Sequence, residues 1–421
     1  MAVTVASVAD TCAAAKQAAT VLAALDSGIK NAALHAVADT LERRSPEILD
    51  ANSRDLAAGR EAHLTAALLD RLSLDERRVA EIARQVRDIA SMPDPVGEVI
   101  EGRRLANGLQ VRKVRVPLGV IAVVYEARPN VTIDAAALCL KAGNAVVLRG
   151  SSMAMHSNAV LAATATEALL EAGFPHGSIA LVAGGGREEL AQLATQTGLV
   201  DLIIPRGGEG LKAALSAVAT VPVLYAASGN CHVYVERSAD QEAALAIALN
   251  AKVQRPSVCN AAETLLVDRA VAGEFLPGAL RALADAGVEL RGDVHVREIA
   301  GDLPVAAASE DDWGTEYHAL TLAIGVVDGT AEAIEHINRY GSGHSDAIVT
   351  RDTDAARSFQ LGVDSACVYV NASTRFTDGG EFGMGAEIGN STQKLHARGP
   401  IGLRELCSYK YLVDGSGHVR G

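Results

Sequence analysis

Residues Val120–Leu148 read VIAVVYEARPNVTIDAAALCLKAGNAVVL, and this segment indicates the fold class. The unbroken apolar run from Val120 to Tyr125 predicts a buried strand, and the apolar segment Val131–Lys141 predicts a helix. Gly143 and Asn144 then supply a turn into a second buried strand, Ala145–Leu148. Two buried strands joined by a helix form a βαβ unit, which is typical of a parallel sheet covered by helices.

The alternation of strand and helix continues to both ends of this α/β region. A helix is expected near Ala159–Glu171. Further strands are predicted at Ile179–Val182, Leu202–Ile204 and Val223–Tyr225, and a second series at His232–Val235, Leu265–Val267, Leu320–Val327, Ala347–Val349 and Cys367–Val370. This order predicts an α/β protein with two doubly wound parallel-sheet domains in tandem. The crevice between two such domains is a common place for a cofactor and a substrate.

The flanks have different patterns. From Ser7 to Met92 apolar residues recur every three or four positions, as in Ile82, Val86 and Ile89, which predicts a helical scaffold. Gln110–Val116 alternates strictly between polar and apolar residues, which predicts one strand of a two-faced β-hairpin. We interpret this hairpin, together with a strand-like C-terminal stretch, as an oligomerisation arm.

The composition of the 421 residues excludes several classes of protein. The formal net charge of −13 argues against nucleic acid and anionic membranes as partners. No apolar run approaches the roughly 18 residues of a membrane span, and Met1–Lys16 lacks the pattern of a signal peptide. Six widely spaced cysteines without CxxC spacing indicate reduced thiols, hence a cytoplasmic location, and the histidines show no metal-ligand spacing.

Glycine turns are the candidates for phosphate binding. Neither GxGxxG nor a P-loop is present, but Gly184-Gly185-Gly186 and the run Arg206-Gly207-Gly208 each follow a predicted strand and lead into a helix. Free N–H groups at a helix N-terminus can hold phosphates, although tight βα turns without a ligand would use the same glycines. Arg149 ends a strand and could meet a ribose phosphate, or it could be a solvated surface residue.

Cys259 is the candidate nucleophile. It lies in the polar run Gln254-Arg255-Pro256-Ser257-Val258-Cys259-Asn260, where a neighbouring cation would lower the thiol pKa from its usual value of roughly 8.5. A buried and inert cysteine is the ordinary alternative. Gly343-His344-Ser345-Asp346 places three catalytic residue types in succession, and we interpret that segment as a loop because neighbours in sequence rarely point together.

Longer blocks extend the argument from single residues to a family. They are Val116–Val120, Tyr125–Asn130, Leu140–Gly150, Ile204–Gly208, Gly229–His232, Gln254–Asn260, Ser373–Gly380, Gly383–Glu387 and Gln393–Pro400. Together they closely resemble the γ-glutamyl phosphate reductases, a branch of the aldehyde dehydrogenase superfamily, from about Val5 to Tyr411.

The resemblance implies a role for each part of the chain. It implies a cofactor-binding domain at 1–98 and 118–226, a catalytic domain at 227–376 and an oligomerisation arm at 99–117 and 395–421. Cys259 falls on the superfamily's nucleophile, and Asn130 lies near an asparagine that holds the oxyanion. Glu316 falls where the superfamily places a carboxylate on the nicotinamide ribose. The other proposed contacts are Arg149, Ser151, Arg206, Gly207 and Gly208 for the cofactor, and Arg255 and Arg375 for the substrate's phosphate or carboxylate.

Two departures from the superfamily narrow the reaction. Hydrolytic members carry a glutamate upstream of the cysteine, but Leu224-Tyr225-Ala226-Ala227 occupies that place here, and a reductase that never hydrolyses its thioester needs no such base. NAD-preferring relatives grip the ribose with a glutamate, whereas this chain has Arg149-Gly150-Ser151-Ser152 at that position. A 2′-phosphate is therefore not repelled, and NADP(H) is favoured.

The expected reaction is NADPH-dependent reduction of L-glutamyl 5-phosphate to glutamate 5-semialdehyde in proline biosynthesis, through a thioester on Cys259. A hydrolytic aldehyde dehydrogenase, a reductase of another amino-acid acyl phosphate and a non-catalytic scaffold are the alternatives. A homo-oligomer is expected. The lability of the acyl phosphate also suggests a glutamate kinase as a partner.

Overall fold

The computed structural model describes residues 7–182, 186–225 and 228–420, so Gly184 and Gly185 of the first glycine turn lie outside the described residues. The chain divides into two compact units. Unit 1 comprises Met1–Tyr225, Met384–Gly389 and Ile401–Gly421, and unit 2 comprises Ala226–Gly383 and Asn390–Pro400. Within the described residues, no helix is long and apolar enough to cross a bilayer.

Unit 1 begins with helices that pack through one apolar face each. They are α1 (Val8–Leu22), α2 (Ser27–Arg43), α3 (Ser45–Glu61), α4 (Ala66–Leu72) and α5 (Glu76–Ser91). The α5 helix starts where the Asp75 side chain accepts a hydrogen bond from the Arg78 backbone N–H at 2.7 Å, and it buries Val79, Ile82, Val86 and Ile89. This spacing of buried residues confirms the predicted helical scaffold.

A four-stranded parallel sheet forms the core of unit 1, in the order β5-β4-β3-β6. Its strands are β3 (Val120–Tyr125), β4 (Ala145–Arg149), β5 (Ile179–Leu181) and β6 (Leu202–Arg206). Its helices are α6 (Val131–Lys141), η1 (Ser152–Ala154), α7 (Met155–Glu171), α8 (Arg187–Ala194) and α9 (Glu209–Val218). The strand predicted at Val223–Tyr225 is instead a single parallel bridge between Val223 and Ile203.

Unit 2 holds a seven-stranded parallel sheet in the order β10-β9-β11-β8-β7-β12-β13. Its strands are β7 (Cys231–Val235), β8 (Ala262–Asp268), β9 (Glu289–Gly292), β10 (Val305–Ala307), β11 (Thr321–Val327), β12 (Ser345–Val349) and β13 (Cys367–Val370). Its helices are α10 (Gln241–Val253), α11 (Arg269–Asp285), α12 (Val294–Ala300), α13 (Glu310–Trp313), α14 (Thr330–Tyr340), α15 (Thr353–Gly362) and η2 (Thr374–Phe376), and the short strands β14 (Asn390–Ser391) and β15 (Gly399–Pro400) pair with each other.

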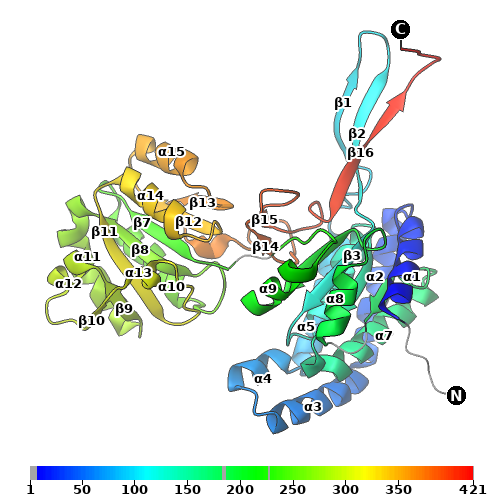
Figure 1. Cartoon of the computed structure of the whole chain (residues 1–421), viewed down its shortest axis with the longest axis horizontal. Helices are drawn as coiled ribbons and strands as arrows, with labels where there is room; N and C mark the ends of the chain where they lie inside the picture. Colours follow the sequence, from blue (N-terminus) through cyan, green and yellow to red (C-terminus); the bar gives the residue numbers. More distant parts are fainter. Residues whose placement is uncertain (1–6, 183–185, 226–227, 421) are drawn as a thin grey trace. The chain divides into compact units, whose positions relative to one another are not determined.

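Helices cover both faces of this second sheet (Figure 1). One apolar cluster joins the sheet to α10, α11 and α12. A separate cluster joins it to α14 and α15 through Ala333, Ile337 and Phe359. Two covered faces account for strands that are almost wholly apolar, and they confirm the doubly wound arrangement.

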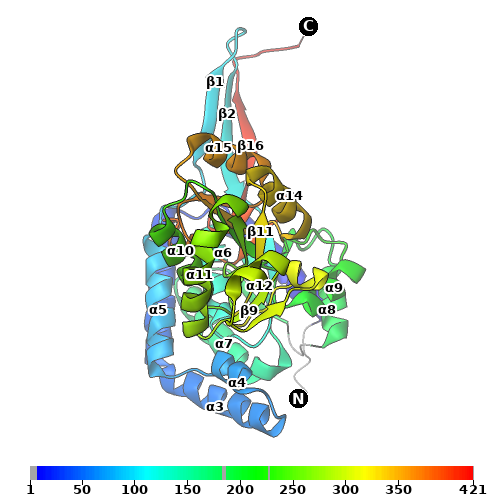
Figure 2. The same ribbon diagram turned by 90° about the vertical axis from the view of Figure 1, so that its left-hand side faces the viewer.

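The arm is a three-stranded antiparallel sheet that belongs to unit 1, with β2 (Gln110–Pro117) between β1 (Val99–Arg104) and β16 (Cys407–Asp414). Figures 1 and 2 show it as a narrow extension of that unit. The first residues of the segment 395–421, which was predicted to belong to the arm, lie in the other unit. Residues 395–400 group with unit 2, where Arg398 bonds to Asp364 at 3.0 Å.

Candidate active site

The nucleophile candidate lies in a turn of unit 2. Cys259 is in the connection between α10 and β8, and it is the one half-buried cysteine of the six; the other five are buried. The helix before this turn ends at Val253, and the strand after it begins at Ala262. A thiol that is partly exposed between two regular elements is accessible and is carried by a rigid frame.

Two neighbours hold the backbone of Cys259 from one side. The buried Cys231 thiol donates to the carbonyl oxygen of Cys259 at 3.2 Å. Gly229 lies so close that an added Cβ would be 1.6 Å from this same oxygen. Burial raises the pKa of Cys231 well above its ordinary value, so this thiol stays neutral and remains a donor. Because Gly229 lies this close to Cys259, any side chain at position 229 would displace the nucleophile.

Two arginines provide positive charge beside Cys259. The Nε atom of Arg375 donates to Oε1 of Gln254 at 2.7 Å, and Arg375 interacts electrostatically with both Arg255 and Cys259. Burial lowers the pKa of Arg375, and the like charge of Arg255 lowers it further, against the opposing effect of Asp378. Two adjacent cations, one partly desolvated, favour an anion between them. The structure thus brings three of the predicted residues, Cys259, Arg255 and Arg375, into one cluster.

Glu316 lies in the segment before β11, with its side chain 14% exposed. Burial tends to raise the pKa of Glu316, but hydrogen bonds from His318 and from the Gly229 backbone N–H outweigh burial and lower it. The Nε2 atom of His318 lies 3.3 Å from the Glu316 carboxylate. Gly229 therefore contacts both residues: its N–H donates to the ionised Glu316 carboxylate, and its Cα packs against the backbone of Cys259.

The loop expected at Gly343-His344-Ser345-Asp346 is confirmed for Gly343 and His344 and is wrong for Ser345 and Asp346. Ser345 and Asp346 belong to β12, and His344, which directly precedes that strand, is likewise 0% exposed. His344 Nδ1 lies 2.8 Å from Ser345 Oγ and 3.8 Å from the Cys231 thiol. Burial lowers the pKa of His344 to about 4, so the ring is neutral near pH 7. The segment is part of the core that supports Cys231.

Arg149 in unit 1 lies deeper than its position at a strand end suggests. Its side chain is 6% exposed, and its Nη2 donates to the Gly186 carbonyl at 2.6 Å. Burial lowers the pKa of Arg149 against the opposing effect of Glu189 and Glu126. The Ser151 hydroxyl accepts a hydrogen bond from the Met153 N–H at 3.1 Å and thereby caps η1. Arg149 and Ser151, which are both predicted to contact the cofactor, therefore each have a hydrogen-bond partner within unit 1.

The glycine run after β6 is more open. Gly208 immediately precedes α9, and no heavy atom lies within 4 Å of where its Cβ would be. The adjacent Gly207 lacks this space, since its Cβ would be 2.7 Å from Oε2 of Glu126, which also accepts the Gly208 N–H at 3.2 Å. Arg206 lies against Gly389 and interacts electrostatically with Asp134. This turn presents a helix N-terminus with room beside it.

Asn130 directly precedes α6 in unit 1, whereas Cys259 belongs to unit 2. Its Nδ2 donates to Asp134 at 2.8 Å. Burial raises the pKa of Asp134 to about 6, opposed by this hydrogen bond and by Arg206. The amide of Asn130 thus has a local partner, a carboxyl group that changes charge close to neutral pH.

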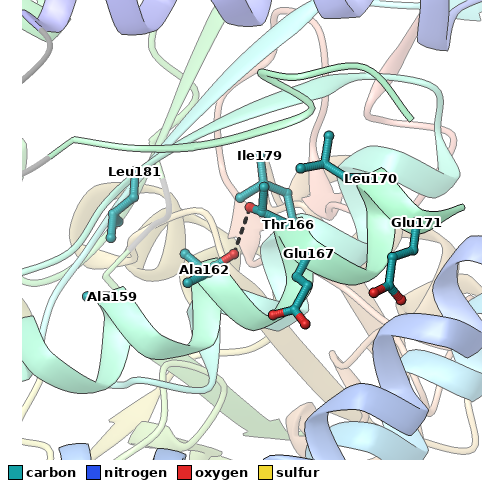
Figure 3. A pocket seen from close by; sticks show the side chains of 9 residues that line it. Ala159, Ala162, Thr166, Glu167, Leu170, Glu171, Ile179 and Leu181 are labelled. Carbon is teal, nitrogen blue, oxygen red and sulfur yellow. Dashed lines mark hydrogen bonds between the residues drawn. The ribbon is translucent and has the colours of Figure 1, made fainter. Parts of the chain in front are cut away.

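A surface groove of about 580 Å³ runs along α7 and β5 in unit 1 (Figure 3). Its walls are mostly alanine and leucine, and within it Thr166 donates to the Ala162 carbonyl at 2.7 Å. The charged groups that line it are the carboxylates of Glu167 and Glu171. An acyl phosphate would be repelled there, so the groove is unsuited to that substrate. In the described part of the chain, no cluster of three or more histidine, cysteine or acidic residues could hold a metal ion.

Several residues that shape this site belong to the sequence blocks but have no predicted role. Gly229 and Cys231 share the block Gly229–His232, while Gln254 and Asn260 flank the predicted cysteine. Their only sequence signal is membership in those blocks. Hydrogen bonds between positions 28 or 115 residues apart, such as Cys231 to Cys259 and Asn260 to Arg375, follow from tertiary packing and have no local pattern.

Fold and site together define an α/β protein of two parallel-sheet units, one of which carries a half-buried cysteine near two arginines. The family model described as the aldehyde dehydrogenase family matches residues 1–295. The γ-glutamyl phosphate reductase of Thermobifida fusca is 54% identical over 406 residues, which cover 96% of this chain and 97% of that protein. The crystal structure of γ-glutamyl phosphate reductase from Thermotoga maritima matches with a TM-score of 0.97 and 45% identity, covering 99% of this chain and 100% of that one. The chain belongs to the aldehyde dehydrogenase family, in the branch of the γ-glutamyl phosphate reductases, as its sequence blocks predicted.

The fold extends to more distant proteins. An acetylating aldehyde dehydrogenase from Geobacillus thermoglucosidasius matches with a TM-score of 0.68 at 18% identity, over 98% of this chain and 97% of that one. This similarity concerns the fold alone. Membership in the family implies a nicotinamide cofactor.

Proposed function

We propose that the protein reduces L-glutamyl 5-phosphate to L-glutamate 5-semialdehyde and phosphate, with NADPH as the reductant and a thioester on Cys259 as the intermediate. The observation that carries this proposal is the half-buried Cys259 beside Arg255 and Arg375, in a chain 54% identical to a γ-glutamyl phosphate reductase. A nucleophilic thiol flanked by cations suits an acyl group whose leaving group is an anion.

The Cys259 thiolate attacks the γ-carbonyl carbon and forms a C–S bond. The proposed donors to the oxyanion are the Cys259 backbone N–H and the Asn130 amide. The C–O bond to phosphate then breaks, and the departing dianion is stabilised by Arg255 and Arg375. When bound, the nicotinamide cofactor would supply the hydride that the thioester carbon needs. Cys259 would then leave: its C–S bond breaks, the thiolate is regenerated and the aldehyde is released.

The proposed steps do not include hydrolysis of the thioester, because the chain lacks the general base that hydrolytic relatives use to activate water. The positions where hydrolytic relatives carry a glutamate are Leu224-Tyr225-Ala226-Ala227, and none of them is a carboxylate. Ala226 and Ala227 lie outside the described residues. Without a base to deprotonate water, the thioester lives long enough to be reduced.

The turn after β6 fits the nicotinamide cofactor. Arg206, Gly207 and Gly208 would hold its phosphates, because the α9 N-terminus places a positive dipole end at the open space beside Gly208, where a phosphate would take the place of the Glu126 carboxylate on the Gly208 N–H. Arg149 and Ser151 would select the 2′-phosphate of NADP(H) at the end of β4. Glu316, ionised and fixed by Gly229, would accept hydrogen bonds from the nicotinamide ribose.

The arm supports the proposal of a homo-oligomer. Tyr409, Tyr411 and Val413 of β16 are each more than half exposed, and Val99 of β1 is 52% exposed. Exposed apolar side chains on a strand that pairs on one edge only are suited to bind another copy of the chain. A glutamate kinase as a further partner rests on the lability of the substrate.

The reverse reaction tests the proposed function. Purified protein is mixed with glutamate semialdehyde and NADP⁺, with and without inorganic phosphate, and NADPH formation is followed. We expect phosphate-dependent turnover that Cys259→Ala abolishes, a loss of at least about 10³-fold. Cys12→Ala is the control, since Cys12 is buried in α1, and its rate should stay within about twofold.

The same assay separates the alternatives. Turnover without phosphate would mean that water resolves the thioester, as in a hydrolytic aldehyde dehydrogenase. Rejection of glutamate semialdehyde, with turnover of another amino-acid semialdehyde, would assign the chain to a different acyl phosphate. An unchanged rate in Cys259→Ala would exclude the thioester altogether.

A further inference from the structure

Asn260 connects the nucleophile turn to a distant segment of unit 2. It directly follows Cys259, and it is 5% exposed. Its Nδ2 donates to the carbonyl oxygens of Arg375 at 3.3 Å and Thr377 at 2.9 Å. Its own backbone carbonyl accepts from the Thr374 hydroxyl at 2.7 Å. Three hydrogen bonds therefore join this one residue to η2 and the residue after it.

The segment that Asn260 holds carries Arg375. The other end of the nucleophile turn is attached to the same arginine, because Arg375 Nε donates to Gln254 Oε1 at 2.7 Å. Asn260 thus fixes the arginine's backbone, and Gln254 fixes its side chain.

Arg375 would not stay in this place for electrostatic reasons alone. Burial lowers the pKa of Arg375 and the like charge of Arg255 lowers it further, and together these two effects outweigh the opposing effect of Asp378. A cation in an unfavourable place must be held by other interactions, and the bonds from Asn260 to its backbone segment are suited to this task. A shift of about 1 Å between two reacting groups can reduce a rate by roughly 100-fold.

We propose that Asn260 is a positioning residue that sets the position of Arg375 relative to Cys259, so that the arginine meets the phosphate of the acyl phosphate while the thiolate attacks its carbonyl carbon. This inference rests on the proposed function. The side chain must be an amide of this length, because a carboxylate could not donate to two carbonyl oxygens and a shorter hydroxyl has one donor only.

A double-mutant cycle in the reverse reaction tests this coupling. We expect Asn260→Ala to raise the KM for inorganic phosphate roughly tenfold, with a smaller loss in kcat, because phosphate is the group that Arg375 contacts. Arg375→Gln should have a similar or larger effect. If Asn260 acts through Arg375, the double variant is no worse than Arg375→Gln alone. Additive losses, or a change in kcat with no change in KM, would overturn the inference.

Alkylation of Cys259 gives a second measurement that does not require turnover. Iodoacetate is an anion and iodoacetamide is neutral, so the ratio of their rates at Cys259, measured by mass spectrometry of the cysteine peptide, reports positive charge beside the thiol. We expect the ratio to fall several-fold in Arg375→Gln and by a similar factor in Asn260→Ala. An unchanged ratio in Asn260→Ala, with a reduced ratio in Arg375→Gln, would show that Asn260 does not position the arginine.

Asn338→Ala is the matched control, because Asn338 is also an asparagine of unit 2 that bridges two segments, donating to Gly362 at 2.8 Å and accepting from Asp364 at 2.9 Å. It should leave both the phosphate KM and the alkylation ratio unchanged. Asn260→Ser, which keeps one donor, replaces Asn260→Ala if the latter does not fold, with an intermediate effect expected.

The outcomes also separate this inference from the proposed function. If Cys259→Ala is inactive and the Asn260 and Arg375 effects are independent, the thioester mechanism stands and the positioning role fails. If Cys259→Ala is active, the proposed function itself fails.

Discussion

The polar residues beside the strands of the two parallel sheets differ in what they contact. In unit 1, Arg149 donates to the Gly186 carbonyl, Ser151 caps a short helix and Asn130 donates to Asp134. In unit 2, the turn that precedes β8 leaves Cys259 half-buried and carries Arg255, while η2 carries Arg375, which interacts electrostatically with both. The polar side chains of the first region bond to neighbouring groups of the same unit, whereas those of the second lie near a reactive thiol.

The difference teaches that a position at a strand end predicts where a side chain lies but not what it is bonded to. Arg149 ends its strand as predicted, yet its guanidinium is buried on a neighbouring carbonyl. Cys259 is held in place by Gly229, Cys231 and Asn260, and none of these three residues has a role predicted from the sequence. Substitutions in both units can test this contrast between polar groups that bond to their neighbours and polar groups that lie near a reactive thiol.

The largest effect is expected at Gly229. In Gly229→Ala the new Cβ would have to lie 1.6 Å from the Cys259 carbonyl oxygen and 2.5 Å from its Cα, so the nucleophile turn must move. We expect kcat to fall by at least about 100-fold, with a loss of stability of about 1–3 kcal/mol from overpacking. Steady-state kinetics of the reverse reaction and urea denaturation followed by Trp313 fluorescence measure the two effects.

Gly273→Ala is the control for that substitution. Gly273 lies inside α11 of the same unit, and no heavy atom lies within 4 Å of the place that a Cβ would take there. Alanine at this position should stabilise the helix by about 0.5–1 kcal/mol and leave kcat unchanged. Full activity in Gly229→Ala would show that the nucleophile turn is not held by this contact.

Two buried titrating groups, Asp134 in unit 1 and His344 in unit 2, should contribute pH dependences of stability with opposite signs. Asp134 in unit 1 has its pKa raised to about 6 by burial, so the folded state binds its proton before the unfolded state does, and its contribution to stability rises as the pH falls. His344 in unit 2 has its pKa lowered to about 4 by burial, so the unfolded state is protonated first, and stability is lost as the pH falls from about 6.5 towards 4. From pH 8 to pH 5 we expect a gain on the order of 1 kcal/mol from Asp134 and a loss on the order of 2 kcal/mol from His344.

The measurement is the difference between the protein and each single variant, Asp134→Asn or His344→Asn, in urea denaturation at pH 5 and pH 8. The difference is needed because the buried pair Lys252 and Glu263 also titrates in unit 2, where burial raises the pKa of Glu263 to about 7. Trp313 is the chain's one tryptophan and lies in unit 2, so its fluorescence reports that unit, while circular dichroism reports both. If the free energy of unfolding changes equally with pH in the protein and in the variant, the substituted group has the same pKa in the folded and the unfolded state.

The fold is largely predictable from sequence because its signals are local. Val131–Lys141 is a helix with the predicted bounds, and the apolar runs at Val120–Tyr125 and Cys367–Val370 are strands as predicted. Val223–Tyr225 has the same apolar character but makes one bridge only, because pairing depends on a neighbouring strand edge that the segment itself does not specify. Likewise, Ser345 and Asp346 favour a loop when only their own residues are considered, but they begin β12, because pairing with distant strands has no local signature.

The smallest effect is expected for cofactor preference at Arg149. If this arginine also meets a 2′-phosphate, Arg149→Met should lower the ratio of kcat/KM for NADPH to that for NADH by about tenfold, or about 1.4 kcal/mol, the contribution of one charge-assisted hydrogen bond. Arg44→Met is the control, because Arg44 pairs with Glu47 and Glu167 on the surface of unit 1 and should leave the ratio unchanged. An equal loss with both cofactors would mean that Arg149 only holds the Gly186 carbonyl, and the contrast between the two sheets would then be complete. A selective loss of NADPH would mean that one buried guanidinium serves both the backbone and the cofactor.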